Sequence, residues 1–569
     1  MAFQLSPGVL VTEKDLTLIV PSVSTTAGGF AGAFQWGPVD EVTTIDSEVA
    51  LVERFGKPND TTYKSFFTAA NFLSYGNNLQ LVRSVDKSVA KNSVVKANTH
   101  GDATLTAVLV ENETDYITNH ASGSGNAAWI AKYPGALGNS LKVSLADANT
   151  WTSWEYKTNF DDRPNTSTYA ATVGGSNDEL HVIVIDEDGL WSGTQGTVLE
   201  RFSFVSKAAD AKLPDGTSNY YKNVINNRSK YVWWGAHTAN VVGTGTAWGA
   251  QAAGTAFDNT TNVANITGSL SLGVSGDSPT DGNLQTSFSL FANDDLYDIS
   301  LIPLGGVSAT VATHVINNVA ETRLDCVVFV SPEQADVVDN AGSEATDVVD
   351  FRDSLPSSSY AVLDSGWKYQ YDRYNDVYRW IPLNGDTAGL AVRTDFVADP
   401  WFSPAGLNRG QIKNVVKLAY SPRKTDRDTL YKKGVNPVVT FPGNGTVLFG
   451  DKTLLAKPSA FDRINVRRLF IVLEKAIATA AKFQLFEFND AFTRAQFRNL
   501  VEPFLREVQG RRGITDFKVV CDETNNTGEV IDRNEFVADI YIKPARSINF
   551  IQLNFVATRT GISFEEVGA

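Results

Sequence analysis

The sequence contains few of the residues that cross-link chains or ligate metals. It has 2 cysteines and 5 histidines among 569 residues. Cys326 and Cys521 are too far apart for a disulfide framework, and no histidine has a neighbour at metal-site spacing. No apolar run approaches the roughly 18–20 residues of a membrane helix, and the first 20 residues lack the pattern of a signal peptide. We therefore expect a soluble protein of cytosolic synthesis with no cofactor, no metal and no membrane insertion.

Positive charge is scarce over most of the chain and concentrated in its last third. Residues 1–400 carry 24 Lys and Arg against 46 Asp and Glu, whereas residues 401–520 carry more than twice as many basic as acidic residues. A module of one sign on a chain of the other sign indicates a charged partner. The aromatic residues of the basic segment follow core periodicity and are not interleaved with the basic ones, which disfavours direct binding of nucleic acid.

The length and the changes in composition predict a multidomain protein of the α+β or α/β class. Residues 24–86 alternate apolar strand runs with helical spacing, and the same character returns after residue 290. Between them, Gly, Ser, Thr, Asn and Asp dominate, and seven of the 11 tryptophans occur there. We expect a 1–23 arm, a discontinuous α/β middle domain (24–86 plus 291–395), a β-rich insertion of one or two modules (87–290), a further α/β domain (396–546) and a C-terminal strand (547–569).

The domain predicted over 396–546 has the most regular pattern of capping residues and apolar spacing. Ser459 and Thr493 each begin a capping-box spacing, and each precedes an apolar helical stripe. Two strands follow, with the turn signal Asn525–Gly528 between them. Residues Ile548–Ala557 then form one more apolar strand that has no partner left in sequence order. A strand without a partner is a candidate for donation to a neighbouring subunit.

Three patterns suggest other functions, and each has a simpler interpretation. Gly445 and Gly450 approach a phosphate loop, but Asp451 spoils its spacing and favours a turn. The carboxylates of 161–188 could imitate a glycosidase pair, although a solvated loop is more typical. The tryptophans of the insertion could bind glycans at an exposed surface, but small β modules commonly bury such side chains.

The most distinctive segments of the sequence are WKYQYDRYNDVYRWIPLNGD (Trp367–Asp386), DPWFSPAGLNRGQIKN (Asp399–Asn414), LYKKGVNPVVTFPGNGTVLFGDKTL (Leu430–Leu454), FEFNDAFTRAQFRNLVEPFLREVQGRRGI (Phe486–Ile514) and FVADIYIKPARSINFIQLNFVATRTG (Phe536–Gly561). These segments resemble the tail sheath proteins of contractile-tailed, T-even-like bacteriophages. In the N-terminal part, SPGVLVTE (Ser6–Glu13) and FLSYGNNLQLVR (Phe72–Arg83) agree. The resemblance is dense over 1–85 and 320–569 and patchy within 87–290.

The resemblance implies a structural, non-enzymatic subunit of a virion tail sheath that is assembled in the bacterial cytoplasm. In such sheaths six copies form a ring, rings stack helically around a tail tube, and N- and C-terminal arms donate strands to neighbouring inner domains. The resemblance implies that 396–546 is the inner domain, which faces the tube and is joined by the 1–23 arm, and that 87–290 is the outer insertion. The extended sheath is metastable, and it contracts on a baseplate signal to drive the tube through the host envelope. The implied partners are further copies, the tail tube protein, and baseplate and tail terminator proteins. The sheath of a genome-free injection particle and a virion-surface carbohydrate-binding protein are the alternatives.

Two groups of residues follow as predicted contact sites. The strand-donating arms are expected to use Leu5, Val9, Val11, Ile548, Phe550, Leu553 and Phe555. An acidic tube surface is expected to face Arg409, Lys413, Arg463, Arg467 and Lys475. The alternative for the basic group is a solvated helix face or salt bridges within the subunit.

Overall fold

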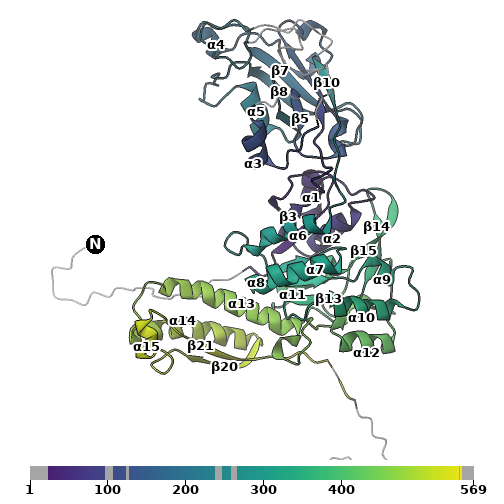
Figure 1. Ribbon diagram of the computed structural model, residues 1–569, viewed down its shortest axis with the longest axis vertical. Helices are drawn as coiled ribbons and strands as arrows, with labels where there is room; N and C mark the ends of the chain where they lie inside the picture. The colour runs from purple at the N-terminus through teal and green to yellow at the C-terminus, as the bar shows by residue number, and fades with distance from the viewer. Residues whose placement is uncertain are drawn as a thin grey trace, which may run out of the picture. The chain divides into compact units, whose positions relative to one another are not determined.

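The structure is a computed structural model that describes residues 24–95, 107–122, 127–237, 247–257, 266–549 and 551–553. These residues divide into two compact units (Figure 1). The larger unit spans residues up to 399 together with 404–464, and the smaller unit comprises 400–403 and the residues from 465 onward. Helices and several sheets are mixed in the chain, which confirms the α+β multidomain class.

A seven-stranded sheet forms the centre of the larger unit. Its order is β17-β13-β12-β11-β1-β3-β2, and every pair is parallel except β2 with β3. The strands are β1 (Gly28–Gly32), β2 (Val42–Ile45), β3 (Leu79–Arg83), β11 (Leu301–Pro303), β12 (Val327–Val330), β13 (Ala361–Asp364) and β17 (Val435–Asn436). The sheet therefore joins chain segments from both sides of the insertion.

Small residues in β1 allow helices to approach both faces of this sheet. A Cβ atom on Gly28 would lie 2.5 Å from Phe72 of α2, whereas one on Gly29 would lie 2.9 Å from Ile299. Because successive residues of a strand point to opposite faces, these two glycines admit one packed layer on each side. The helices of the unit are α1 (Glu48–Phe55), α2 (Tyr63–Leu73), α6 (Asp281–Ser289), α7 (Ala309–Val315), α8 (Glu321–Arg323), α9 (Gln334–Val337), α10 (Glu344–Ser354), α11 (Asn384–Val397) and α12 (Lys424–Lys432).

Two small sheets complete this part of the larger unit. They are the order β15-β14-β16 and the hairpin β18-β19. Their strands are β14 (Trp367–Asp372), β15 (Val377–Pro382), β16 (Lys417–Leu418), β18 (Val438–Phe441) and β19 (Gly445–Leu448). The C-terminal domain predicted from residue 396 thus differs from the observed division, because 404–464 belongs to the larger unit. Strand β17, which adds this segment to the central sheet, has only two residues, so the sequence shows no strand periodicity there.

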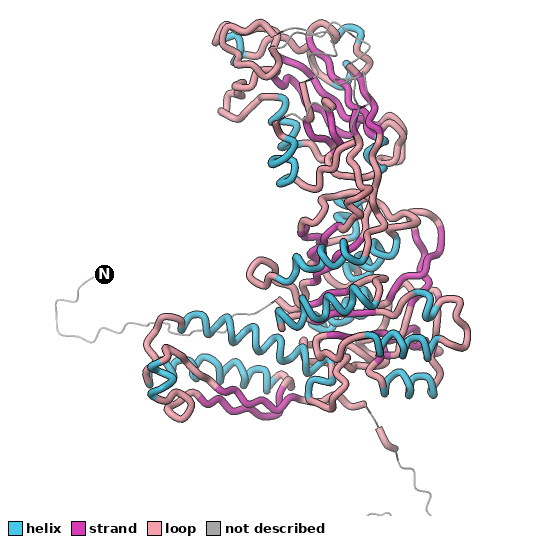
Figure 2. Tube along the Cα trace, viewed as in Figure 1, coloured by secondary structure: helices cyan, strands magenta, loops and turns pink. Residues whose placement is uncertain are grey.

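The insertion is built on one antiparallel seven-stranded sheet with the order β8-β7-β6-β10-β4-β5-β9 (Figure 2). The strands are β4 (Val94–Val95), β5 (Trp129–Ala131), β6 (Leu141–Asp147), β7 (Glu179–Asp186), β8 (Thr197–Ser206), β9 (Val232–Trp234) and β10 (Thr267–Ser271), and the α-helices are α3 (Glu113–Asp115), α4 (Thr168–Thr172) and α5 (Tyr221–Arg228). Trp129 and Trp233 are among its most deeply buried side chains. Large aromatic side chains fill a core that the short strands could not otherwise fill.

The smaller unit packs two long helices against a two-stranded sheet. The elements are α13 (Ile464–Ala481), α14 (Ala491–Gly510), β20 (Ile514–Val520), α15 (Gly528–Asp532) and β21 (Asp539–Pro544). Its core includes Leu473 of α13, Val501 and Leu505 of α14, and Cys521. The cap of helix α14 is Asp490, three residues before the predicted cap Thr493, and its side chain accepts a hydrogen bond from the Thr493 backbone. The turn predicted at 525–528 leads directly into α15, which occupies the rest of the connection between β20 and β21.

Candidate assembly surfaces

The carboxyl edge of the parallel sheet is filled by the chain's own side chains. Open α/β sheets bind ligands at this edge. Here Ser331, after β12, donates a hydrogen bond to the Asp364 carboxylate at 2.7 Å, and the Asn384 amide nitrogen donates to the Gly305 carbonyl after β11 at 2.7 Å. Trp367 donates its indole N–H to the Pro332 carbonyl at 2.8 Å. All of these polar groups are satisfied internally, so this edge serves packing.

Burial changes the protonation of this edge. Asp364 is buried, and its pKa is raised to about 8 by burial and by the nearby Asp386 carboxylate, against the hydrogen bonds from Gly366 and Ser331. Asp386 forms an ion pair with Lys368 at 2.8 Å, and both side chains are fully buried. The edge is therefore an internal polar network between strands and α11.

The carboxylates of 161–188 and the glycine-rich segment Gly445–Gly450, which suggested enzymatic sites, instead stabilise turns and loops. Asp186 accepts hydrogen bonds from Ser140 and from the Trp191 and Ser192 backbone, so its pKa is lowered even though burial opposes the change. In the glycine-rich segment, Gly445 begins β19, and Lys452 donates to the Tyr431 carbonyl at 2.8 Å. Among the described residues, no cluster of His, Cys, Asp and Glu could hold a metal ion. None of the helices described is long and apolar enough to cross a membrane.

The insertion offers no exposed tryptophan platform in its described part. Five of its tryptophans are at most 4% exposed, and the others, Trp151 and Trp191, are partly buried against the same core. These side chains are core residues, as the simpler interpretation of the sequence held.

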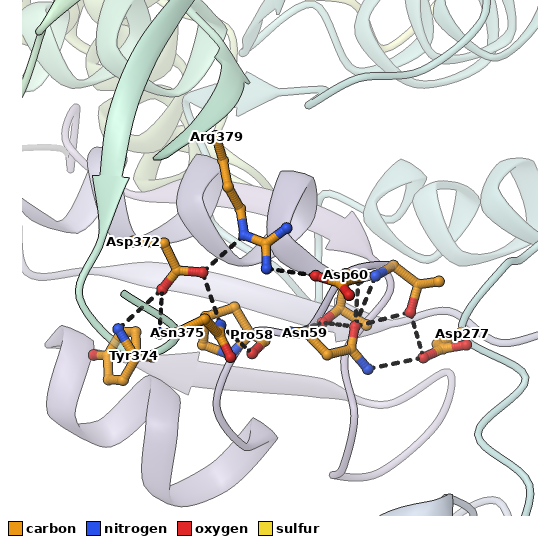
Figure 3. Close-up of polar contacts among 10 residues, drawn as sticks. Pro58, Asn59, Asp60, Asp277, Asp372, Tyr374, Asn375 and Arg379 are labelled. Atoms are coloured by element: carbon orange, nitrogen blue, oxygen red, sulfur yellow. Dashed lines mark hydrogen bonds and ion pairs between the residues drawn. The ribbon is translucent and has the colours of Figure 1, made fainter. Parts of the chain in front are cut away.

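A polar clamp holds together three segments that are distant in sequence (Figure 3). Arg379 of β15 donates to Asp372 at 2.8 Å and to Asp60 at 2.7 Å. Asn59 donates to Asp277, which follows the last strand of the insertion, at 3.2 Å. Hydrogen bonds to charged groups are stronger than neutral ones. The clamp therefore ties the loop before α2 to the β14–β15 hairpin and to the returning end of the insertion.

Arg83 fixes the root of the insertion. Its guanidinium is fully buried and donates to the carbonyls of Phe34 at 2.8 Å, Gly37 at 2.9 Å and Pro134 at 2.8 Å. Burial lowers the pKa of Arg83 to about 9. Since Phe34 and Gly37 follow β1 while Pro134 belongs to the insertion, one side chain binds both parts.

The smaller unit presents the edges of a short sheet. Within the described residues, β20 pairs with β21 and with no other strand. Phe517 and Ile540 lie on the side that packs against the helices. A two-stranded sheet is marginal by itself, and unpaired strand edges are templates for further strands. Both outer edges of this sheet are thus candidate sites for an added strand.

The segment that follows β21 is apolar and exposed. Ile548 is 82% exposed and Leu553 is 71% exposed, and no strand is assigned to residues 545–549 and 551–553. The expected strand therefore does not form within the described part of one chain. The other predicted arm residues, Leu5, Val9, Val11, Phe550 and Phe555, lie outside the described residues.

The predicted tube-facing residues differ in exposure. Lys413 is exposed, and its ammonium group donates to the Ser74 carbonyl at 2.6 Å. Arg409 and Lys475 are half-buried. Arg463 lies 3.7 Å from Asp451, and Arg467 is only 4% exposed, with its Nη2 atom 3.6 Å from Glu474. Arg463 and Arg467 thus make the salt bridges within the subunit that the sequence left open as the alternative.

Known proteins place this chain in a family. Family models match residues 25–83 (tail sheath protein Gp18 domain III N-terminal region), 296–454 (phage tail sheath protein central domain) and 456–558 (phage tail sheath C-terminal domain). The tail sheath protein of Vibrio phage KVP40 is 37% identical, over 99% of this chain and 99% of its own length. The chain belongs to the phage tail sheath family.

Further relatives agree with this assignment. The tail sheath protein of Enterobacteria phage T4 is 33% identical, over 99% of each chain. The crystal structure of a sheath tail protein from Desulfitobacterium hafniense has the same fold, with a TM-score of 0.52 and 13% identity over 90% of this chain and 94% of that one. The chain is thus a tail sheath protein of contractile phages, and tail sheath proteins are components of the virion.

Sequence reasoning missed several residues that shape this sheath protein. Arg83 ends an apolar strand, and a charged residue at the end of a buried strand could have indicated a buried group with structural partners. The Asp372–Arg379 clamp lies inside a segment that was read only for its family resemblance. The aromatic residues between α13 and α14 also lie in such a segment, and their exposure depends on where the helices end.

Proposed function

We propose that this chain is the repeating subunit of a contractile sheath, in which six copies form a ring and rings stack helically around a tail tube. Association with further copies is the property that its homologues support. In this proposal the subunit acts as a structural element and catalyses no reaction. Contraction draws its energy from the difference in contacts between two arrangements of the same subunits. The subunit is assembled in the bacterial cytoplasm, and baseplate and tail terminator proteins bind the ends of the sheath.

The observation that carries this proposal is that one chain has both a two-stranded sheet with unpaired outer edges and an exposed apolar segment after it. The β20–β21 sheet has outer edges without a strand partner in the described part of the chain. Ile548 and Leu553 are exposed just beyond it. We propose that the terminal segment of one copy adds a strand to this sheet in a neighbour, and that Leu5, Val9 and Val11 do the same from the N-terminal side. Five or six backbone hydrogen bonds at about 0.5–1.5 kcal/mol each would give several kcal/mol per arm.

The contact with the tube is proposed to be electrostatic. Lys413 is the exposed member of the predicted basic group, with Arg409 and Lys475 half-buried. Arg463 and Arg467 also carry positive charge, which is partly offset by their ion pairs with Asp451 and Glu474 of the same chain. Exposed charge contacts are worth about 0–1 kcal/mol each and are screened by salt. Weak contacts of this kind suit a sheath that must release its tube.

Truncation of the terminal segment tests the proposal. The full chain, examined by negative-stain electron microscopy, is expected to form hollow, helically ribbed, six-fold tubes. A chain ending at Ser547 is expected to remain monomeric, while a chain ending at Arg559, which keeps Ile548 through Phe555, is expected to assemble. Tubes from the chain ending at Ser547 would contradict the arm assignment. Monomers from the full chain, with or without tail tubes present, would contradict the sheath function.

A further inference from the structure

The loop that joins α13 to α14 lies beside α15 (Figure 1). Together with the first turn of α14, this loop exposes an unusual set of apolar side chains. Phe486 is fully exposed, and the remaining members are 62–84% exposed. The set consists of Phe483, Leu485, Phe486, Phe488 and Phe492, which we call the aromatic loop. Large exposed apolar patches mark interaction sites on soluble proteins.

The aromatic loop is held in place by hydrogen bonds. Asn489 donates to the Asn526 side chain at 3.1 Å and to the Glu535 carbonyl at 2.8 Å, and it accepts from Arg494 at 3.0 Å. Asp490 caps α14 directly afterwards. A surface that is already ordered loses little conformational entropy on binding. The exposed rings are thus displayed by an anchored backbone.

The backbone of the loop is strained at its most exposed ring. Phe486 has a φ of +70°. Bulky residues rarely adopt this left-handed conformation, and strain of this kind gathers at functional sites. The hydrogen bonds of Asn489 and the cap of α14 confine the chain on the C-terminal side of Phe486. The loop therefore maintains a costly conformation that directs an apolar ring to solvent.

The exposed area is sufficient for a specific interface. At about 200 Å² for each phenylalanine side chain, the aromatic loop exposes roughly 700 Å². A standard interface between proteins buries about 800 Å² on each partner. One loop therefore supplies most of one half of a stable interface.

The charges on the aromatic loop select among partners. Between Phe483 and Thr493 the only ionisable residues are Glu487 and Asp490. An acidic rim around an apolar centre complements a basic surface and repels an acidic one. Helix α14 and the two residues after it (491–512) hold five arginines and two glutamates. Arg506 and Arg511 are more than half exposed, and each lies 3.6 Å from a glutamate four residues before it, so the arginines are in excess on this surface. The proposed tube surface is acidic and would repel this rim.

We propose that the aromatic loop docks onto the arginine-rich surface of α14, and of the residues just after it, in a second copy of this chain. This contact is separate from the donated strand, and it rests on the proposed sheath function because it requires that copies assemble. The rings of Phe486 and Phe488 form its apolar centre, and Glu487 faces basic residues of the neighbouring copy.

Assembly of the full chain in the absence of tail tubes tests this contact. The double variant F486S/F488S is expected to need at least a tenfold higher concentration than wild type to assemble, as measured by sedimentation and electron microscopy. F396S is the matched control, because Phe396 is a 64% exposed ring of the larger unit. The circular dichroism and melting temperature of all variants are expected to match wild type, since the substituted rings are exposed. E487K keeps the rings and is expected to weaken assembly as well, because it places a cation against basic residues.

Three results would overturn the inference. Assembly of F486S/F488S and E487K at the concentration needed by F396S would exclude the aromatic loop from contacts between copies. Normal assembly of these variants alone, with defects only on tail tubes, would assign the loop to the tube. Failure of the wild-type chain to assemble at all would overturn the proposed function and this inference with it.

Discussion

At the residue scale, buried charged groups determine how the sheath subunit is held together. Arg83 satisfies backbone carbonyls from two parts of the larger unit, and Lys368 pairs with Asp386 inside it. Such groups are costly to bury, so each must find its partners in the fold. The sequence presents these residues as isolated charges in apolar runs. Their partners belong to other elements of the fold, which is why sequence patterns did not reveal their roles.

Asp364 gives the subunit a pH-dependent stability. Its pKa of about 8 in the folded chain exceeds its ordinary value of 3.8. The folded state therefore keeps a proton that the unfolded state loses, and stability falls as pH rises from about 4 to 8. D364N cannot ionise and is expected to show a smaller decrease in melting temperature between pH 5 and pH 8. Thermal unfolding of wild type, D364N and the exposed-site control D376N measures this, and equal slopes for all three would contradict it.

At the element scale, the sequence predicted elements with strong local signals. Ser47 stands before a helical spacing of apolar residues, and in the structure its hydroxyl accepts a hydrogen bond from the Ala50 backbone at the start of α1. The capping box at Thr493 failed because Asp490 is an equally good cap three residues earlier. The terminal strand was inferred from its apolar composition alone. Strand pairing needs a partner edge, and no sequence pattern states whether that edge belongs to the same copy.

Two leucines of the smaller unit separate folding from assembly. Leu505 of α14 is fully buried, whereas Leu553 is 71% exposed. L505A is expected to destabilise this unit by about 2–5 kcal/mol, because it leaves a cavity in the core. L553S is expected to change stability by less than about 0.5 kcal/mol, as is usual for exposed sites, and yet to weaken assembly. Denaturant unfolding and sedimentation measure the two effects, and unimpaired assembly of L553S would argue against the donated strand.

At the scale of the whole molecule, the division of charge predicts opposite responses to salt. The chain carries a net charge of −15, so copies repel one another and added salt is expected to favour assembly of the chain alone. Association with tail tubes is expected to weaken with salt, because the proposal has Lys413 and the other residues of the predicted basic group attract an acidic surface. K413E is expected to reduce tube association and its salt sensitivity without affecting assembly alone. Co-sedimentation with purified tubes between low and high salt measures both, and a salt-independent tube association would contradict the electrostatic contact.

The two ends of the insertion meet at its root, and this feature makes the outer part of the subunit interchangeable. The Asp86 backbone N–H donates to the Gly276 carbonyl at 2.8 Å, and Lys91 bridges Val274 in antiparallel fashion. A module whose ends are adjacent can be exchanged for another without stretching the sheet beneath it. Lineages could thus replace the exterior of the tail while retaining its mechanical interior, and an unrelated domain with neighbouring termini could be grafted at the same root for display on a particle.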